Sequence, residues 1–234
     1  MKRFYTTDIA LPYCFLHEEE AAHCIKVLRG RVGDKVEILD GNGKCYAGEI
    51  SDIGKKEVQI TITDTLQEVR ERPNLLAIAI CPTKNPARLE WFIEKATEIG
   101  IDRIYPIISK RTEKQNIKKE RLEQLIISAA KQSGQLHFPV LEELQSFDQL
   151  LKNTAGLYEQ YMIAHCEDDK KHLKEVYTTG KHALLLIGPE GDFTAEEVKK
   201  ALQQAYLPVS LGNSILRVET AGLMACATVA NSNY

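Results

Sequence analysis

A strand that runs directly into a glycine-rich loop and then into a helix constrains the fold of this chain most strongly. Residues Ala183–Ile187 (ALLLI) are continuously apolar, which is typical of a strand buried on both faces of a parallel sheet. Gly188-Pro189-Glu190-Gly191 follows at once, and Thr194 with Glu197 forms a capping-box pattern that marks a helix start. The pattern predicts an α/β domain whose loop lies at the carboxyl end of a strand, where ligands bind in open sheets.

A second unit of the same kind follows. Residues Pro208–Leu211 predict a short strand, Gly212 lies in the next loop, and a helix rich in small residues is predicted at Thr220–Ala230. Two such loops can face each other across one pocket. Arg217 and Glu219 stand beside the helix start, where a guanidinium can hold a phosphate or a developing anion. The spacing fits equally well an ion pair between them that only orders the loop.

The rest of the α/β domain is predicted from alternating strand and helix patterns. Further strands are expected at Leu75–Cys81, Arg103–Ile108 and Tyr161–Ala164, and a further helix at Ala195–Ala205. Two more helical faces consist of apolar residues at helical spacing: Leu89, Phe92, Ile93, Ala96 and Ile99, then Leu122, Leu125, Ile126 and Ala129.

The first third of the chain has a different pattern. Short strands are predicted at Lys35–Asp40, Cys45–Ile53 and Glu57–Thr63, with Asn42-Gly43 as a hairpin turn and a helix at Glu18–Arg29. A polar segment closed by Pro73 separates this barrel-like β module from the α/β domain. We therefore expect two domains, residues 1–72 and 73–234.

Charge and cysteine usage narrow the function classes. With 30 basic and 33 acidic residues, the net charge of −3 argues against a protein that coats nucleic acid by bulk charge. Local basic patches remain, one at Lys110, Arg111, Lys114, Lys118, Lys119 and Arg121, the other at Lys2, Arg3, Lys26, Arg29, Arg31 and Lys35. The 6 cysteines are scattered without metal-ligand spacing, so we expect no disulfide framework and no metal. No signal peptide or membrane span is predicted, which favours a cytoplasmic protein.

Several enzyme classes lack motif support. The chain contains neither Gly-x-Gly-x-x-Gly nor a P-loop, which disfavours dinucleotide enzymes and P-loop nucleotidases. A nucleophile elbow of the type Gly-x-Ser-x-Gly is also absent from the sequence, which disfavours an α/β hydrolase.

Two motifs together resemble a known family. IGPEG at 187–191 and LGNSILRVETA at 211–221 are similar to the signature pair of the RsmE family of 16S ribosomal RNA uridine-N3 methyltransferases, in the SPOUT superfamily. The segments KNPARLEWFIEKATEIGIDRIYPIISKRTEK and AAKQSGQLHFPVL resemble the middle of that family. RFY and HCIKVLRGRVGDKVEILDGNGKCYAGEI resemble its amino-terminal PUA-like RNA-binding domain. The resemblance covers nearly the whole chain.

This resemblance implies a trefoil-knotted α/β methyltransferase domain behind a PUA-like β-barrel domain, assembled as a homodimer. It implies S-adenosyl-L-methionine as cofactor and 16S ribosomal RNA, in the small ribosomal subunit, as partner. The cofactor pocket carried over by position consists of Ile187, Gly188, Pro189, Glu190, Gly191, Leu211, Gly212, Ile215, Leu216 and Arg217. The chain departs from the family at Asp192, usually glycine, and at Asn213-Ser214, usually Pro-Arg, which removes an arginine from the substrate side.

Methylation at uridine N3 requires loss of the ring proton and in-line alignment of the nitrogen with the methyl group, so catalysis is mostly positioning. We hypothesise that Arg217 stabilises the uridine anion or its phosphate, and that Glu219 orients Arg217 or relays the proton. Glu190 is the reserve base. Residues expected to contact RNA are Arg3, His23, Lys26, Arg29, Arg31, Lys84 and Arg88, although a lone histidine on a helix is more often structural.

Two other functions remain open from sequence. The same fold can act on a ribose 2′-hydroxyl or on another base, which nucleoside mass spectrometry separates. A non-catalytic RNA-binding factor can keep the fold, and failure to bind the cofactor would identify it.

Overall fold

A computed structural model describes residues 2–69, 74–166 and 170–233. The chain divides into two compact units, residues 1–72 with 130–138, and residues 73–129 with 139–234. The predicted boundary at Pro73 lies outside the described residues. The sequence prediction assigned 130–138 to the second domain, whereas the structure places this segment in the first unit. Its backbone joins that unit through hydrogen bonds from Gly43 N to Leu136 O at 3.0 Å and from Phe138 N to Gly41 O at 2.9 Å.

The first unit is built on a six-stranded sheet. Its strand order is β1 (Lys2–Tyr5), β4 (Lys35–Leu39), β5 (Lys44–Ile53), β6 (Glu57–Glu68), β3 (Tyr13–His17) and β2 (Ile9–Ala10). The hairpin predicted at Asn42-Gly43 is confirmed, because β4 and β5 pair antiparallel with Leu39 opposite Cys45. Alternate residues of these strands, such as Ile38, Ile50 and Ile60, are fully buried in one core.

The helix predicted at Glu18–Arg29 is shorter and irregular. It consists of α1 (Glu18–Ala22) and a π-helical turn, η1 (His23–Val27), and Arg29 has a positive φ of 49°. Cys24 faces the core, whereas Lys26 and Val27 are exposed. The turn therefore presents a short surface that carries a cation and an apolar side chain.

The second unit is a parallel α/β sheet. Its strand order is β10 (Gln145–Ser146), β8 (Arg103–Ile108), β7 (Leu76–Ile80), β12 (Ala183–Ile187), β11 (Gln160–Ala164) and β13 (Leu207–Val209), with β9 (Val140–Leu141) also on β8. The pairings between these strands are parallel. Every residue of β7 and β12 is buried, as their apolar sequences predict.

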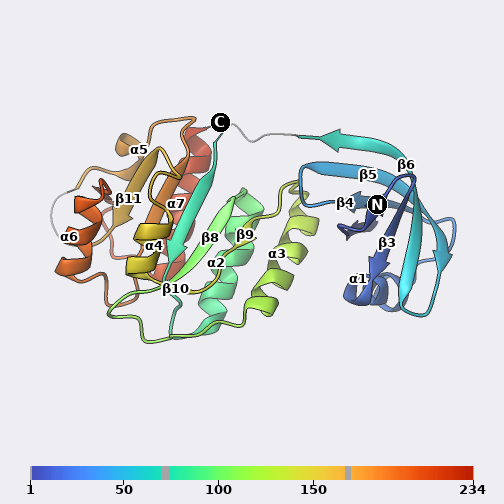
Figure 1. Ribbon diagram of the computed structural model, residues 1–234, viewed down its shortest axis with the longest axis horizontal. Coiled ribbons are helices and arrows are strands. Elements are labelled where there is room, and N and C mark those ends of the chain that lie inside the picture. The colour runs from blue at the N-terminus through green and yellow to red at the C-terminus, as the bar shows by residue number, and fades with distance from the viewer. Residues whose placement is uncertain (1, 70–73, 167–169, 234) are drawn as a thin grey trace. The chain divides into compact units, whose positions relative to one another are not determined.

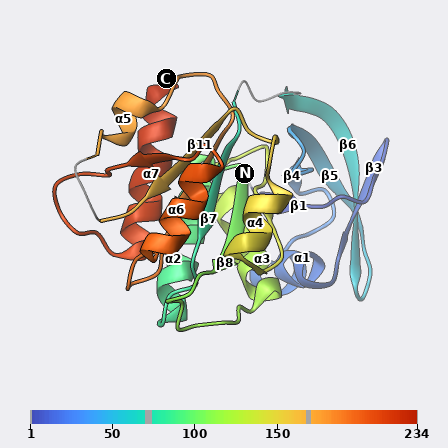
Figure 2. The same cartoon turned by 60° about the vertical axis from the view of Figure 1, so that its left-hand side comes forward.

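Helices cover both faces of this sheet. On one face, α4 (Phe147–Asn153) and α6 (Ala195–Gln203) pack over Ala77, Ala79, Leu184 and Leu186, and they lie in front of the strands in Figure 2. The other helices are α2 (Pro86–Ile99), α3 (Lys119–Ser133), α5 (Leu173–Val176) and α7 (Val218–Ser232), labelled in Figure 1. None of the helices in the described ranges is long and apolar enough to cross a membrane.

The helices α2 and α7 approach each other closely at a glycine. A Cβ placed on Gly222 would lie 2.7 Å from Phe92 Cε2 and 3.1 Å from Ile80 Cδ1. The small residues of α7 thus allow the helix to pack against α2 and the sheet. The trefoil knot that the family resemblance implies stays a prediction.

Candidate active site at the carboxyl ends of the parallel strands

A pocket of about 630 Å³ opens at the carboxyl ends of β11, β12 and β13. Because these strands are parallel neighbours, the loops that follow them meet at one edge of the sheet. The pocket brings together the glycine loop after β12 and the loop 210–217 after β13, as the repeated sequence pattern suggested. All the predicted cofactor-binding residues line it except Gly191.

A third loop completes the pocket and was not predicted. It follows β11 and contributes His165, Cys166 and Lys170, next to Ala164 at the end of the strand. No glycine motif marks this loop in the sequence, and only the pairing of β11 between β12 and β13 places it at the site.

Asp192 joins two of the three loops. Its Oδ2 accepts a hydrogen bond from Cys166 N at 2.7 Å, and its Oδ1 accepts one from Phe193 N at 2.8 Å. The residue has φ of 62°, a left-handed conformation that glycine adopts freely and aspartate tolerates. The departure from the family glycine is thereby explained, since the carboxylate connects the β11 loop to the β12 loop.

The glycine loop is also fixed from the other side. Glu190 is exposed, and one of its carboxylate oxygens accepts a hydrogen bond from Lys84 N at 3.0 Å. Arg111 donates from Nη1 to Gly191 O at 2.7 Å. Gly191 thus anchors the loop through its carbonyl, although it does not line the pocket.

The start of α6 is tied to the same region. The predicted capping box is present, with Thr194 N donating to Glu197 Oε2 at 2.9 Å and Glu197 N donating to Thr194 Oγ1 at 3.3 Å. The buried Glu197 also accepts a hydrogen bond from Lys110 N at 2.8 Å. One carboxylate therefore fixes both the helix start and the loop after β8.

The loop after β13 presents apolar side chains at the pocket. Gly212 has φ of 139°, and its N–H donates to Ser210 Oγ at 3.2 Å in a tight turn. Ile215 is 89% exposed, the highest value among the exposed large hydrophobic residues. Leu211 and Leu216 are partly buried beside it. These side chains can cover an apolar part of a bound ligand.

Arg217 and Glu219 do not form the ion pair that the sequence left open. Arg217 is exposed at the pocket, and its guanidinium makes no hydrogen bond or ion pair with the residues described. Glu219 is buried and pairs instead with Arg88, whose Nε lies 3.7 Å from Oε1. Glu219 Oε2 is buried without a hydrogen-bond partner among the described residues. Glu219 thus does not orient Arg217 directly, and Arg88, expected to contact RNA, is engaged by Glu219.

The other predicted RNA-binding residues have different surroundings. Lys26, Arg29 and Arg31 are exposed on the first unit. Arg3 donates to Glu37 Oε2 at 2.8 Å and to Lys131 O at 2.7 Å, so much of its guanidinium serves the unit itself. The His23 ring lies edge-on to Phe4 at 6.4 Å, and Lys84 Nζ is 2.9 Å from Glu113. Across the described ranges, no group of three His, Cys, Asp or Glu side chains is placed to hold a metal ion.

Comparisons with known proteins agree with this geometry. Residues 70–230 match a family model described as RNA methyltransferase domain, and residues 16–63 match one described as RNA methyltransferase PUA domain. A protein of Rickettsia conorii named ribosomal RNA small subunit methyltransferase E is 30% identical over 218 residues, covering 92% of this chain and 88% of that protein. A Bacillus subtilis protein with the same name is 29% identical over 224 residues, covering 90% and 87%.

Solved structures resemble both units. A probable rRNA-methyltransferase from Porphyromonas gingivalis has a TM-score of 0.89 and 35% identity, covering 100% of this chain and 98% of its own. A putative methyltransferase from Legionella pneumophila, solved in complex with bound cofactor SAM, has a TM-score of 0.88 and 27% identity, covering 99% and 97%.

Proposed function

The chain belongs to the RNA methyltransferase family that includes ribosomal RNA small subunit methyltransferase E, and from this premise we propose that it methylates N3 of a uridine in 16S ribosomal RNA. S-adenosylmethionine is the cofactor. One observation carries the proposal: the two family motifs, which α6 and β13 separate in the sequence, line one pocket at the carboxyl ends of parallel strands.

The pocket suits S-adenosylmethionine in size and chemistry. Its volume of about 630 Å³ lies within the range of roughly 300–1,000 Å³ that is usual for small-molecule sites. Ile187, Leu211 and Leu216 offer apolar surface for the adenine ring, and the loop backbones offer hydrogen bonds to the polar groups. When bound, S-adenosylmethionine supplies an electrophilic methyl group.

The residues of this chain position the uridine and accept its proton. Arg217 lies exposed at the pocket without a competing carboxylate partner in the described chain, so it is available to stabilise the uridine anion or a phosphate. Glu190 lines the pocket and is the candidate proton acceptor, because its carboxylate is held in place by Lys84 N. Glu219 acts through Arg88, or relays the proton with its unpaired oxygen.

The first unit is the proposed RNA-binding domain, consistent with its match to an RNA methyltransferase PUA domain. Exposed Lys26, Arg29 and Arg31 give it salt-sensitive contacts to phosphates, and Lys84 adds one on the second unit. We also propose a cytoplasmic homodimer that acts on the small ribosomal subunit. Its interface would use the exposed side of α7, where Met224 is 42% exposed.

The reaction is tested with small ribosomal subunits from cells that lack the activity. Purified protein and labelled S-adenosylmethionine should produce 3-methyluridine, identified by nucleoside mass spectrometry. A 2′-O-methyl nucleoside or another methylated base would overturn the N3 assignment. No transfer and no cofactor binding by calorimetry would indicate a non-catalytic RNA-binding factor.

The role of Arg217 is tested by two substitutions in the same assay. Arg217→Ala should lower kcat about a hundredfold, as expected for loss of one group that stabilises developing charge. Arg217→Lys should recover part of the rate, since it keeps the charge without the planar fork. Full turnover by Arg217→Ala on the subunit would refute the role.

A further inference from the structure

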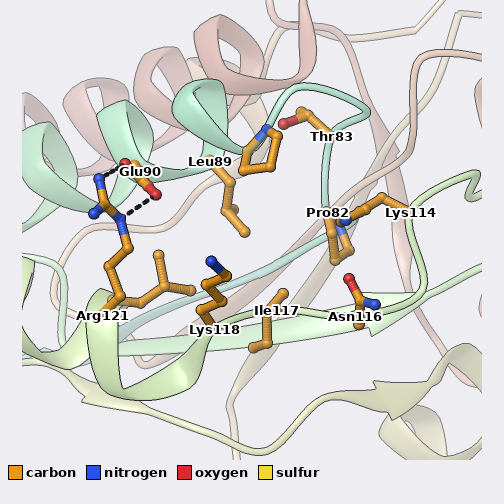
Figure 3. Close-up of a pocket in the computed structure, with 11 residues that line it drawn as sticks. Pro82, Thr83, Leu89, Glu90, Lys114, Asn116, Ile117, Lys118 and Arg121 are labelled. Atoms are coloured by element: carbon orange, nitrogen blue, oxygen red, sulfur yellow. Dashed lines mark hydrogen bonds and ion pairs between the residues drawn. The ribbon is translucent and has the colours of Figure 1, made fainter.

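A second pocket lies on the same unit, outside the cofactor site. It has a volume of about 230 Å³ and lies between the loop after β7, the first turns of α2, the segment 114–118 and the start of α3. Figure 3 shows its lining side chains gathered around one hollow, with Leu89 above and Ile117 below. Neither family motif contributes to this pocket.

The walls of this pocket are largely apolar. Leu89 and Leu122 are almost fully buried, and Pro82 and Pro86 add flat ring surfaces. Ile117 forms the opposite wall. Proline rings and branched aliphatic side chains can sandwich a flat ring, as in pockets that hold an unstacked base between apolar side chains.

The rim of the pocket is positively charged. Lys114, Lys118 and Arg121 line it, against Glu90 as the single carboxylate. Arg121 already engages Glu90 through two bonds, of 2.6 and 2.8 Å, drawn in Figure 3. The ammonium groups of Lys114 and Lys118 form no ion pair with any residue in the described ranges. Two cations thus remain for an anionic ligand.

Size narrows the identity of the ligand. A volume of about 230 Å³ falls below the roughly 300–1,000 Å³ of usual small-molecule sites, so the pocket takes about one ring system. The exposed Asn116 amide can pair with the edge of such a ring. A nucleotide combines a flat polar ring with an anionic phosphate, and it therefore fits both the pocket and its charged rim.

The loop after β7 lies between the two pockets. Pro82 and Thr83 line the second pocket, and the next residue, Lys84, donates its backbone N–H to Glu190 of the first. β7 and β12 are paired neighbours, so their carboxyl ends are about 5 Å apart. A single strand of RNA that places one base in the first pocket can place a nearby base in the second.

We propose that this second pocket binds the base of a nucleotide close to the target uridine, with Lys114 and Lys118 on its phosphate. The proposal deepens the proposed function, because it takes ribosomal RNA as the substrate. In this role the pocket selects the RNA sequence around the target uridine and directs the path of the RNA strand, and it does so independently of cofactor binding.

The first test fills the pocket. Ile117→Trp should raise KM for small ribosomal subunits about tenfold or more, a loss typical of one stacked base, with little change in kcat. Gln115→Trp is the matched control, because Gln115 is exposed on the same segment and does not line the pocket. Cofactor affinity, measured by calorimetry, should be unchanged in both variants. An unchanged KM for Ile117→Trp would overturn the proposal.

The second test locates the RNA without requiring methyl transfer. Small subunits labelled with 4-thiouridine are irradiated with the protein, and crosslinked peptides are identified by mass spectrometry. We expect nucleotide adducts on residues 114–122, reduced in Ile117→Trp and in Lys118→Glu but not in the charge control Lys199→Glu. Peptide crosslinks to a ribosomal protein at this pocket, or nucleotide adducts elsewhere only, would overturn the proposal. Adducts here without 3-methyluridine would instead refute the proposed reaction alone.

Discussion

Asp192 provides the sharpest test of how the cofactor pocket is assembled. The carboxylate holds Cys166 N at 2.7 Å, and this bond connects the loop after β11 to the glycine loop after β12. We compare Asp192→Asn, Asp192→Gly and Asp192→Ala. Asparagine keeps an acceptor without the charge, glycine restores the family residue without an acceptor, and alanine loses the acceptor while the backbone keeps φ of 62°.

The magnitudes follow from two opposing effects. A hydrogen bond to a charged group contributes about 1.5–3 kcal/mol, and the partial exposure of Asp192 places it at the lower end. A non-glycine residue in the left-handed region costs about 1–2 kcal/mol relative to glycine. Asp192→Gly should therefore regain, from relieved backbone strain, much of the stability that it loses with the hydrogen bond. Asp192→Asn should lose about half of the free energy that the bond contributes. Asp192→Ala should be the least stable variant, by about 2 kcal/mol.

Urea denaturation gives the stability, and calorimetry gives the affinity for S-adenosylmethionine. Alanine should weaken cofactor binding about tenfold, since a loosened β11 loop must be ordered again on binding and each tenfold corresponds to about 1.4 kcal/mol. Asparagine should fall between alanine and the wild type in both measurements. Glycine should fall between them in stability but match alanine in cofactor affinity, because it also lacks the acceptor for Cys166 N. If Asp192→Ala matches the wild type in both measurements, the bond to Cys166 does not organise the pocket.

Three further predictions concern packing, capping and pH. Gly222→Ala should destabilise the protein by about 1–3 kcal/mol, because its Cβ would lie 2.7 Å from Phe92; Lys199→Ala, at an exposed position of α6, should change urea stability by less than about 0.5 kcal/mol. Thr194→Val should cost about 1 kcal/mol in the same assay and Thr194→Ser almost nothing, since serine also caps. Burial raises the pKa of the Cys81 thiol to about 11 from 9.0. The free energy of unfolding that depends on this thiol is therefore complete below pH 9 and is lost between pH 9 and 11, because the thiol ionises first in the unfolded chain. Cys81→Ala should flatten the fall of thermal stability measured across that interval.

The strands that could be predicted from sequence are those whose burial leaves a local pattern. Ala183–Ile187 and Arg103–Ile108 match β12 and β8 in both bounds. The continuous apolar run of β12 is buried at every position, and the four central residues of β8 are buried as well, because both faces of the sheet are covered. The helix predicted at Glu18–Arg29 was wrong in its second half, where a π-helical turn begins at His23. Helical spacing of apolar residues does not distinguish these two windings over so few residues.

Long-range pairing could not be read from the sequence. The segment 130–138 begins in the last turn of α3, and tertiary contacts, such as its bonds to Gly41 and Gly43, show that it belongs with the first unit. In the same way, the spatial order of the strands, β12, β11 and then β13, differs from their order in the sequence, which is β11, β12 and then β13. Strand order in a parallel sheet is a tertiary property, because each crossover helix separates neighbours by many residues.

The same limit explains which site residues the sequence revealed. Glycine loops are visible because a ligand close to the backbone requires glycine at fixed positions, and this requirement is local. Cys166 and Lys170 carry no such requirement, so their loop is visible only through strand order. The pairing of Glu219 with Arg88 joins the starts of two helices far apart in the chain, and the nearer Arg217 was the more obvious partner from spacing. Because Glu219 pairs with Arg88, the Arg217 guanidinium stays available for the substrate, and the structure thus decides against the Arg217–Glu219 ion pair that sequence spacing left open.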